Sequence, residues 1–442
     1  MRRPHPVTST LLLLLLSVPA RGAQQPATEG RPARPVVTVD SQSPESLEEL
    51  RRRLDILAAE VERLRSEEPE PVTLTDARRR SLGLAPSAAA TYRRPTAGVS
   101  FAGYGELLAE NFAAENESGA GNAPTTRIDL LRAVLYTGYR FNDRFLFNSE
   151  LEVEHGNEIF VEFAYVDYLA SDNLTLRGGL VLIPLGLVNE FHEPNVFLGA
   201  RRPETETRII PTTWRENGGG VLGTAGPITY RAFVTNGFRG AGFDSAGLRG
   251  GRQKGVQARA ANLAFSGRLD VAAVPGLLAG IGVYTGGSGQ EQVVVGGQAL
   301  TMGTSVVEVH AQGQIRGFDI RTLFAQSSVD DAGAASLALG RPLSAPIAET
   351  MQGGYVQVGY DVLSQRSTDV AVTPYIRYER LDTQHEISPG YARDLTRDGM
   401  FTTLGLDVKP IPNVVIKTEY QWITNEAGSG RNQFNLNLGY SF

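Results

Sequence analysis

Residues 431–442 read RNQFNLNLGYSF, and this stretch decides the fold. Successive side chains of a β-strand point to opposite faces, so alternate residues share a face. One face of this stretch is apolar and the other is polar, the apolar residues being Phe434, Leu436, Leu438, Tyr440 and Phe442. The alternation predicts a strand of about ten residues that separates an apolar from a polar environment.

The same alternation recurs in residues 412–424, 304–314 and 144–155. A soluble β-sandwich also alternates, so other features have to distinguish the two classes. Strands of about ten residues match a tilted membrane crossing, and tyrosines near strand ends are typical of an interfacial girdle. The final Phe442 inside an alternating strand resembles the assembly signal of bacterial outer-membrane proteins. The sequence therefore predicts an all-β protein, a transmembrane β-barrel over residues 99–442.

Sixteen antiparallel strands are expected. Their predicted ranges are 99–110, 127–141, 144–155, 159–170, 173–182, 218–224, 227–236, 255–265, 276–285, 304–314, 318–328, 352–362, 369–381, 400–409, 412–424 and 431–442. Short turns and long connections alternate in phase along this series. Because bacterial barrels have short periplasmic turns and longer external loops, both barrel ends of the chain are expected in the periplasm.

The composition excludes several classes of protein. The chain has 442 residues and no cysteine, which excludes disulfide scaffolds, Cys-ligated metals and thiol nucleophiles. Its 42 basic and 48 acidic residues give a net charge of −6, so no nucleic-acid partner is expected. Only three of the basic residues are lysines, namely Lys254, Lys409 and Lys417.

The N-terminus predicts export. Arg2 and Arg3 precede the apolar run Leu11–Leu16, and small residues follow, as in a secretory signal peptide over residues 1–23. The alternative is a membrane anchor, for which the apolar run is short of the roughly 20 residues required. The predicted location is the outer membrane of a Gram-negative bacterium.

Three segments are expected between the signal peptide and the barrel. Residues 24–44 are predicted to be flexible, residues 45–66 to form a short α-helical coiled coil in the periplasm, and residues 67–98 to be a linker. The coiled coil rests on leucine and valine residues at spacings of three and four, namely Leu47, Leu50, Leu54, Leu57, Val61 and Leu64. The alternative is a single amphipathic helix docked on the main domain.

A sixteen-stranded barrel is too wide to be filled by its own wall and encloses water. The polar faces of the strands would then line a lumen, and the basic residues expected there are Arg177, Arg231, Arg259, Arg321, Arg377 and Lys417. For each of them the alternative is a cross-strand ion pair with a structural role.

The third external connection, residues 183–217, is the longest and carries both charged and apolar residues. Apolar residues such as Phe191, Phe197 and Ile210 predict that it packs against a wall. Arginine suits oxyanions because its planar fork binds two oxygens at once. Arg201, Arg202 and Arg208 are therefore the candidates for a charged pore constriction, with Arg215 beside them. The alternative is that they pair with Glu190, Glu193, Glu204 and Glu206.

Residues 177–186, RGGLVLIPLG, resemble the G-x5-P-x-G segment of the phosphate-selective porin (O/P) family. Residues 214–220, WRENGGG, and the Asn236-Gly237 pair sit where that family has its next hairpin. The resemblance implies a homotrimeric outer-membrane porin for passive uptake of small anions, phosphate or organic acids, and some related trimeric porins also carry a coiled coil. The phosphate-specific members use clustered lysines, which three scattered lysines cannot supply.

Other functions are less well supported by the residues. A hydrolase would need a Ser/His pair, and the histidines His155, His192, His310 and His385 show no telling spacing to a serine. No enzyme activity, cofactor or metal is therefore expected. A structural or adhesive barrel would need a filled lumen, and no plug domain is evident. The expected partners are outer-membrane lipid and small solutes, with organic acids or sugars as the alternative substrates.

Overall fold

The computed structural model describes residues 44–66, 71–121, 123 and 125–442. The expected signal peptide and all but the last residue of the expected flexible segment lie outside the described residues. The chain divides into two compact units, Met1–Glu68 and Pro69–Phe442.

The described part of the first unit is one helix, α1 (Pro44–Ser66). Leu50, Leu54 and Leu57 repeat at helical spacing along it, and each is about 60% exposed. None of the helices in the described residues is long and apolar enough to cross a membrane. The pairing of α1 into a coiled coil stays a prediction.

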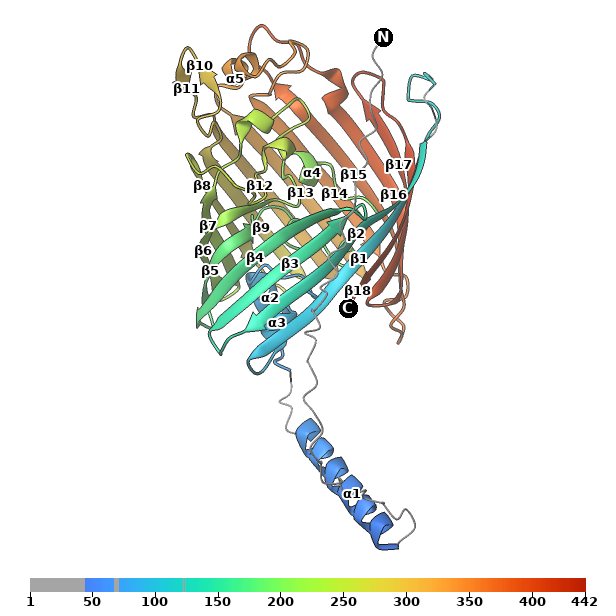
Figure 1. Ribbon diagram of the computed structural model, residues 1–442. Coiled ribbons are helices and arrows are strands. Elements are labelled where there is room, and N and C mark those ends of the chain that lie inside the picture. Colours follow the sequence, from blue (N-terminus) through green and yellow to red (C-terminus); the bar gives the residue numbers. More distant parts are fainter. Residues whose placement is uncertain (1–43, 67–70, 122, 124) are drawn as a thin grey trace, which may run out of the picture. The chain divides into compact units, whose positions relative to one another are not determined.

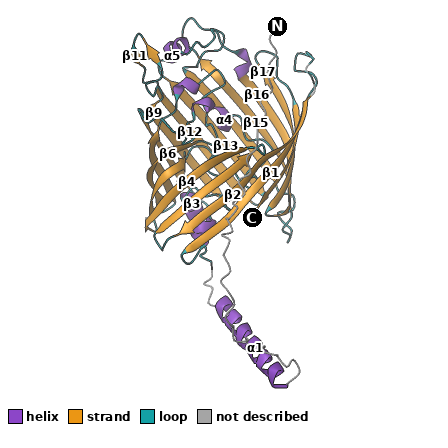
Figure 2. Cartoon of the chain, in the orientation of Figure 1, coloured by secondary structure: helices purple, strands orange, loops and turns teal. Residues whose placement is uncertain are grey.

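Within the described residues, sixteen antiparallel strands close into a barrel in which each strand pairs with its neighbours in the chain and β1 pairs with β18 (Figures 1 and 2). The strands are β1 (Gly98–Phe112), β2 (Thr125–Arg140), β3 (Phe145–Glu154), β4 (Glu158–Ser171), β5 (Leu174–Leu182), β6 (Arg215–Ala225), β7 (Ile228–Asn236), β8 (Leu263–Val271), β9 (Leu277–Gly287), β12 (Gly303–Ile315), β13 (Phe318–Val329), β14 (Thr350–Tyr360), β15 (Ala371–Glu386), β16 (Asp398–Ile411), β17 (Val414–Asn425) and β18 (Gln433–Ser441). This confirms the predicted fold class and strand number of the barrel.

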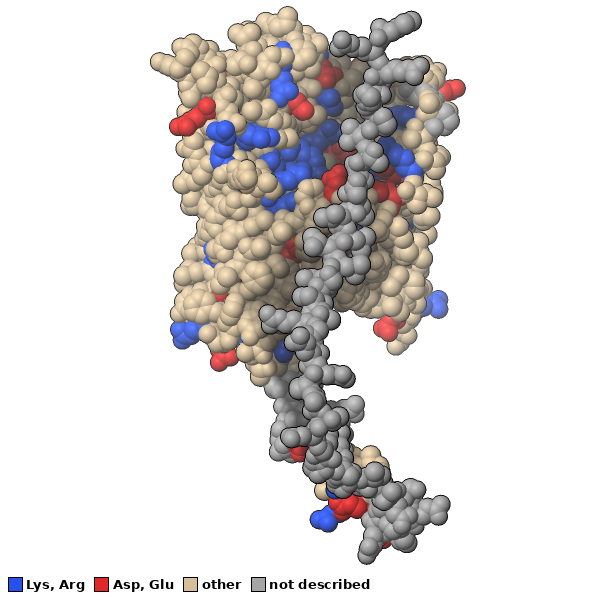
Figure 3. All heavy atoms as spheres, in the orientation of Figure 1, with Lys and Arg blue, Asp and Glu red and all other residues tan. Residues whose placement is uncertain are grey.

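The strands form because their alternating faces meet two different surroundings. In β18 the apolar residues Phe434, Leu436 and Leu438 are exposed on the outer wall, whereas Asn435 and Asn437 are fully buried inside. A space-filling view shows the outer wall as largely uncharged, with Lys and Arg gathered in a hollow of the barrel (Figure 3). The barrel is therefore apolar outside and polar inside.

The two ends of the barrel differ in their connections, as expected. Short segments such as 172–173, 226–227 and 316–317 join strands at one end, which we call the turn end. Longer segments join them at the other, the loop end, where β10 (Val294–Val295), β11 (Gln298–Ala299), α5 (Ala332–Ala338) and the short 3-10 helices η1 (Gly240–Gly242), η2 (Arg249–Gly251) and η3 (Leu395–Arg397) lie. Strand β1 begins and strand β18 ends at the turn end.

One predicted strand, residues 255–265, is wrong. The strand is β8 (Leu263–Val271), and most of the predicted range belongs to a connection. The charged residues Arg268 and Asp270 made 266–275 resemble a turn, but both point into the barrel and pair with each other at 2.9 Å. As a result Arg259, expected in the lumen, lies exposed in the connection between β7 and β8.

The expected linker, residues 67–98, is instead folded over most of its length. Residues 71–97 contain α2 (Asp76–Ser81) and α3 (Ala90–Arg93) and lie inside the barrel near the turn end (Figure 1). Leu82, Leu84 and Tyr92 from this segment pack with wall residues such as Tyr136 and Phe233 in one buried cluster. We call residues 71–97 the inner segment.

Candidate functional site

The connection between β5 and β6, residues 183–214, folds into the lumen; we call it the inner loop. Its two ends meet, because the Ile183 N–H donates to the Trp214 carbonyl at 3.0 Å. Asn189 closes the same junction: its amide donates to the carbonyls of Ile183 and Trp214 at 2.7 and 3.0 Å, and its oxygen accepts from the Trp214 N–H at 2.6 Å. The inner loop is thus a closed loop with a defined base. This agrees with the prediction that the connection packs against a wall.

Charged residues of the opposite wall hold the far side of the inner loop. Lys417 on β17 donates to the carbonyls of Phe197 and Gly199, both at 2.9 Å. Glu379 on β15 accepts from the N–H groups of Glu204 and Thr205 at 3.0 and 2.6 Å. These inward-facing charges are bonded to backbone of the inner loop, so they act as anchors of the inner loop rather than as free lumen charges.

A buried carboxylate fastens the middle of the inner loop. Glu206, in the short helix α4 (Thr205–Arg208), accepts from the Val188 N–H at 2.7 Å and from the Tyr355 hydroxyl at 2.6 Å. Burial raises the pKa of this carboxyl above its usual range. The close approach of Glu206 also requires Gly186, where a Cβ would lie 2.4 Å from a carboxylate oxygen.

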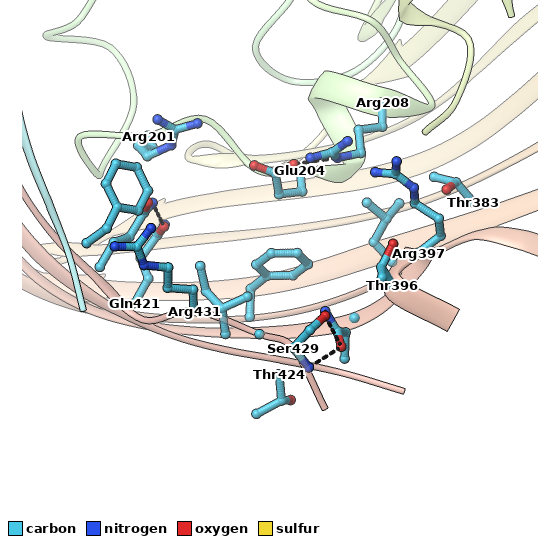
Figure 4. A pocket seen from close by; sticks show the side chains of 18 residues that line it. Arg201, Glu204, Arg208, Thr383, Thr396, Arg397, Gln421, Thr424, Ser429 and Arg431 are labelled. Carbon is cyan, nitrogen blue, oxygen red and sulfur yellow. Dashed lines mark hydrogen bonds and ion pairs between the residues drawn. The ribbon is translucent and has the colours of Figure 1, made fainter. Parts of the chain in front are cut away.

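On the loop side of the inner loop the structure encloses two neighbouring cavities. The first, of about 380 Å³, is lined by residues that include Arg201, Glu204, Arg208, Arg397 and Arg431 (Figure 4). The second, of about 140 Å³, shares Arg201 and Glu204 with the first. Arg132, Arg202 and Arg249 also line the smaller cavity. Together the cavities form an arginine-rich recess.

In the part of the chain that the structure describes, no carboxylate neutralises two of the guanidinium groups that line the smaller cavity. Among the described residues, no carboxylate lies within ion-pair distance of Arg202 or Arg249, and one terminal nitrogen of Arg202 has no hydrogen-bond partner. Arg249 donates to the backbone carbonyls of Thr207 and Thr212. Burial and the neighbouring guanidinium of Arg202 lower the pKa of Arg249 to about 10. A site of this kind favours an anion, which would supply the missing countercharge.

Most of the predicted lumen bases instead have local partners. Their ion pairs are Arg177–Asp167 at 2.8 Å, Arg215–Glu162 at 2.7 Å, Arg231–Asp270 at 2.7 Å, Arg231–Glu190 at 3.1 Å, Arg321–Asp319 at 2.8 Å and Arg208–Glu204 at 2.7 Å. Arg201 pairs with Glu110, and Arg377 donates to the Arg201 carbonyl at 3.2 Å. Of the ten predicted residues, Arg201, Arg202 and Arg208 line the cavities, Arg259 is exposed in the connection between β7 and β8, and the other six pair within the wall or hold the inner loop.

Sequence reasoning missed Arg249, which comes from the connection between β7 and β8. That connection, residues 237–262, contains Arg239, Arg249, Arg252, Lys254 and Arg259 but only one acid, Asp244. This excess of positive charge could have indicated that the connection contributes basic residues to an anion site. What the sequence could not show is that the connection folds over the inner loop, where Arg252 donates to the carbonyls of Pro211 and Thr213 at 3.0 and 2.7 Å.

The described residues offer no group of three His, Asp or Glu side chains that could hold a metal ion.

No protein-family model matches the chain. The chain is 36% identical over 365 residues to an uncharacterized protein of Aquifex aeolicus (strain VF5), covering 79% of this chain and 81% of that protein. Among solved structures it is similar to OmpF of Salmonella typhi in complex with daunomycin, with 10% identity, 78% and 97% of the two chains covered and a TM-score of 0.52. It is also similar to the outer membrane channel DcaP of Acinetobacter baumannii, with 14% identity, 78% and 98% covered and a TM-score of 0.49. The likeness to OmpF shows the barrel fold.

Proposed function

The chain belongs to the same family as the Aquifex aeolicus protein, and from this premise and its barrel fold we propose that it is an outer-membrane porin. It forms a water-filled channel for passive diffusion of small anionic solutes. The observation that carries the proposal is the arginine-lined recess above the inner loop, in which Arg202 and Arg249 lack carboxylate partners. The function is transport and not catalysis.

The wall supports a place in a membrane. Large apolar side chains such as Phe101, Leu151, Val356 and Trp422 are exposed around the barrel, as in a wall that faces lipid. A barrel with an apolar outer band and a polar lumen suits the outer membrane. By the rule that turns are periplasmic, the turn end and the inner segment face the periplasm.

We further propose a homotrimer joined through barrel walls and α1. Leu50, Leu54 and Leu57 of α1 lie on one stripe and are exposed within their own unit, and most helical stability in proteins comes from packing of such an apolar face. Association of several copies along this stripe would bury it.

The substrate class is small oxyanions, including phosphate and organic acids. A phosphate-specific site of clustered lysines is not supported, because Lys409 donates to the Asn195 carbonyl at 2.8 Å and Lys417 is an anchor of the inner loop. The remaining lysine, Lys254, lies over the Phe160 ring at 4.8 Å. Guanidinium groups, which bind two oxygens of phosphate or carboxylate, supply the recognition instead.

One observation favours a second candidate function. The inner segment and the inner loop both occupy the lumen, as expected of a structural or adhesive barrel that conducts nothing. Conductance separates the two candidates.

The first test is a planar-bilayer recording with Arg202→Gln and Arg249→Gln. In the unchanged protein we expect discrete steps and a reversal potential that shows anion preference across a salt gradient. Removing both charges should lower the anion-to-cation permeability ratio about thirtyfold, since each nearby charge contributes on the order of 1 kcal/mol, or about fivefold, in a wet pore.

Arg259→Gln is the matched control, because Arg259 is exposed in the same connection as Arg249 and outside both cavities. It should leave the ratio unchanged. An unchanged ratio in the Arg202→Gln, Arg249→Gln protein would remove these residues from the constriction. Absence of conductance in a correctly folded barrel would move the conclusion to the structural function.

A further inference from the structure

The inner segment is a small folded unit of its own. The Val72 N–H donates to the Arg93 carbonyl at 2.8 Å, so the two ends of the segment meet. The Arg79 guanidinium donates to the Leu84 carbonyl at 2.5 Å and closes the turn after α2. No residue of the segment belongs to the barrel ladders, because β1 begins at Gly98. The segment is therefore joined to the barrel wall covalently only through its last residues, 94–97, which lead into β1.

Hydrogen bonds and ion-pair networks fix the inner segment to the wall. The Tyr92 hydroxyl donates to Asp167 on β4 at 2.6 Å, and Arg231 on β7 donates to the Arg80 carbonyl at 2.8 Å. Asn148 on β3 donates to the Ala88 carbonyl at 2.9 Å. The side of the segment that faces the wall is thus held by hydrogen bonds and by the buried apolar cluster that contains Leu82, Leu84 and Tyr92.

The inner segment also bonds to the inner loop. The Ser87 and Ala88 N–H groups both donate to one oxygen of Glu193, at 2.8 and 3.1 Å. Gly83 lies so close to the inner loop that a Cβ there would be 2.1 Å from an oxygen of Glu190. The two elements together fill the middle of the barrel.

Little space remains between them. The cavity next to α2 has about 40 Å³, against about 380 and 140 Å³ on the loop side. It is lined by Arg79 and Arg80 of α2, by Phe191 and Val196 of the inner loop, and by wall residues such as Arg321. A cavity of this size holds about one or two water molecules, which is too little for a hydrated oxyanion.

We propose that the inner segment is a movable plug that closes the turn end of the channel and leaves its seat as one unit when the channel conducts. The proposal rests on the proposed porin function. The plug is held in its seat, by which we mean its contacts with the wall and the inner loop, by hydrogen bonds and side-chain packing. It takes no part in the strand pairing of the barrel. The strands therefore stay paired when the plug pivots at residues 94–97. Because the plug continues into the segment that bears α1, a load on α1 in the periplasm would act on the plug directly.

The plug can be fastened chemically, because the chain has no cysteine of its own. The hydroxyl oxygens of Thr91 on α3 and Ser100 on β1 are 2.5 Å apart, so cysteines at both positions can form a disulfide across the pivot. The control pair is Ser305→Cys with Ser328→Cys, whose hydroxyl oxygens are 2.8 Å apart on the paired strands β12 and β13, away from the plug.

Gly83→Val is the opposite change. It places a side chain against Glu190, and next to the guanidinium of Arg231 on β7, at a residue with φ of +63°, and so it should push the plug from its position. Each full-length protein is recorded in planar bilayers, with the cysteine pairs measured oxidised and then reduced.

We expect oxidation of the Thr91→Cys, Ser100→Cys protein to lower conductance at least about tenfold, because the disulfide holds the plug in place and depopulates the conducting state. Reduction should restore it, and the control pair should not respond. Gly83→Val should conduct more than the unchanged protein. Equal conductance of all these proteins would overturn the plug and leave the porin standing. Absence of conductance in every one of them, Gly83→Val included, would overturn the porin and the plug with it.

Discussion

Asp167→Leu is expected to lower the free energy of unfolding by about 3–5 kcal/mol, the usual cost of removing one partner from a buried ion pair. Both oxygens of Asp167 bind the Arg177 guanidinium, at 2.8 and 2.9 Å, and one also accepts from the Tyr92 hydroxyl. Asp167 is fully buried and Arg177 is 7% exposed. Leucine would leave a buried guanidinium without countercharge, still lying over the Tyr165 ring at 3.8 Å.

The measurement is urea unfolding in detergent micelles, followed by the fluorescence of the two tryptophans. Asp167→Leu combined with Arg177→Met should regain most of the lost stability, because the double variant has no buried charge left over. Asp143→Leu is the control, since its pair with Arg140 is 3.9 Å long and the Asp143 side chain is 97% exposed. It should change stability by less than about 1 kcal/mol. A loss as small in Asp167→Leu would contradict the structural role of the pair.

Trp214→Ala is expected to cost about 3–5 kcal/mol, as large-to-small changes of buried aromatics do. Trp214 is fully buried at the base of the inner loop. Its ring stacks on Phe238 at 4.3 Å and meets Tyr284 at 4.7 Å, so it joins the inner loop, the connection between β7 and β8, and the wall. Alanine would leave a cavity at the junction of these three elements.

The same change should weaken anion preference. Arg249 donates to the Thr212 carbonyl, two residues before Trp214, so loss of the tryptophan removes the support of that contact. Trp214→Phe keeps the stack with Phe238 and should lose much less stability and no selectivity. Unfolding can be followed through the remaining Trp422 and selectivity through the reversal potential. A stable Trp214→Ala protein with an unchanged reversal potential would show that this junction does not position Arg249.

The strands could be predicted from the sequence because successive side chains of the wall alternate between apolar surroundings outside and polar surroundings inside. Leu436 and Asn437 occupy opposite faces in the structure as the alternation implies. Residues 255–265 failed for a physical reason. The inward-facing residues of β8 include Arg268 and Asp270, which are two positions apart. Two such charges resemble a turn in the sequence unless it is known that their side chains pair with each other.

The contents of the lumen could be predicted only in part. The apolar residues of the inner loop predicted a packed connection, and Ile209 and Ile210 are fully buried in the structure. The inner segment was missed because its buried apolar residues, such as Leu82, Leu84 and Tyr92, follow neither helical nor strand periodicity and lie among prolines and alanines. Its polar contacts are tertiary as well: the Arg80 carbonyl accepts from Arg231 of the wall, and the Ser87 N–H donates to Glu193 of the inner loop. Tertiary hydrogen bonds of this kind leave no pattern in a single sequence.

The pairing of β1 with β18 has a consequence for biogenesis. The Asn437 amide donates to Glu106, and the two residues are 331 positions apart in the sequence. The pairing of β1 with β18 therefore joins the two ends of the barrel sequence. Contacts of such long sequence separation form slowly. Until they form, two strand edges with exposed N–H and C=O groups remain open to other chains. The nascent protein therefore has to be kept from associating with its neighbours until its last strand arrives, and the segment that precedes β1 has to be enclosed in the same event.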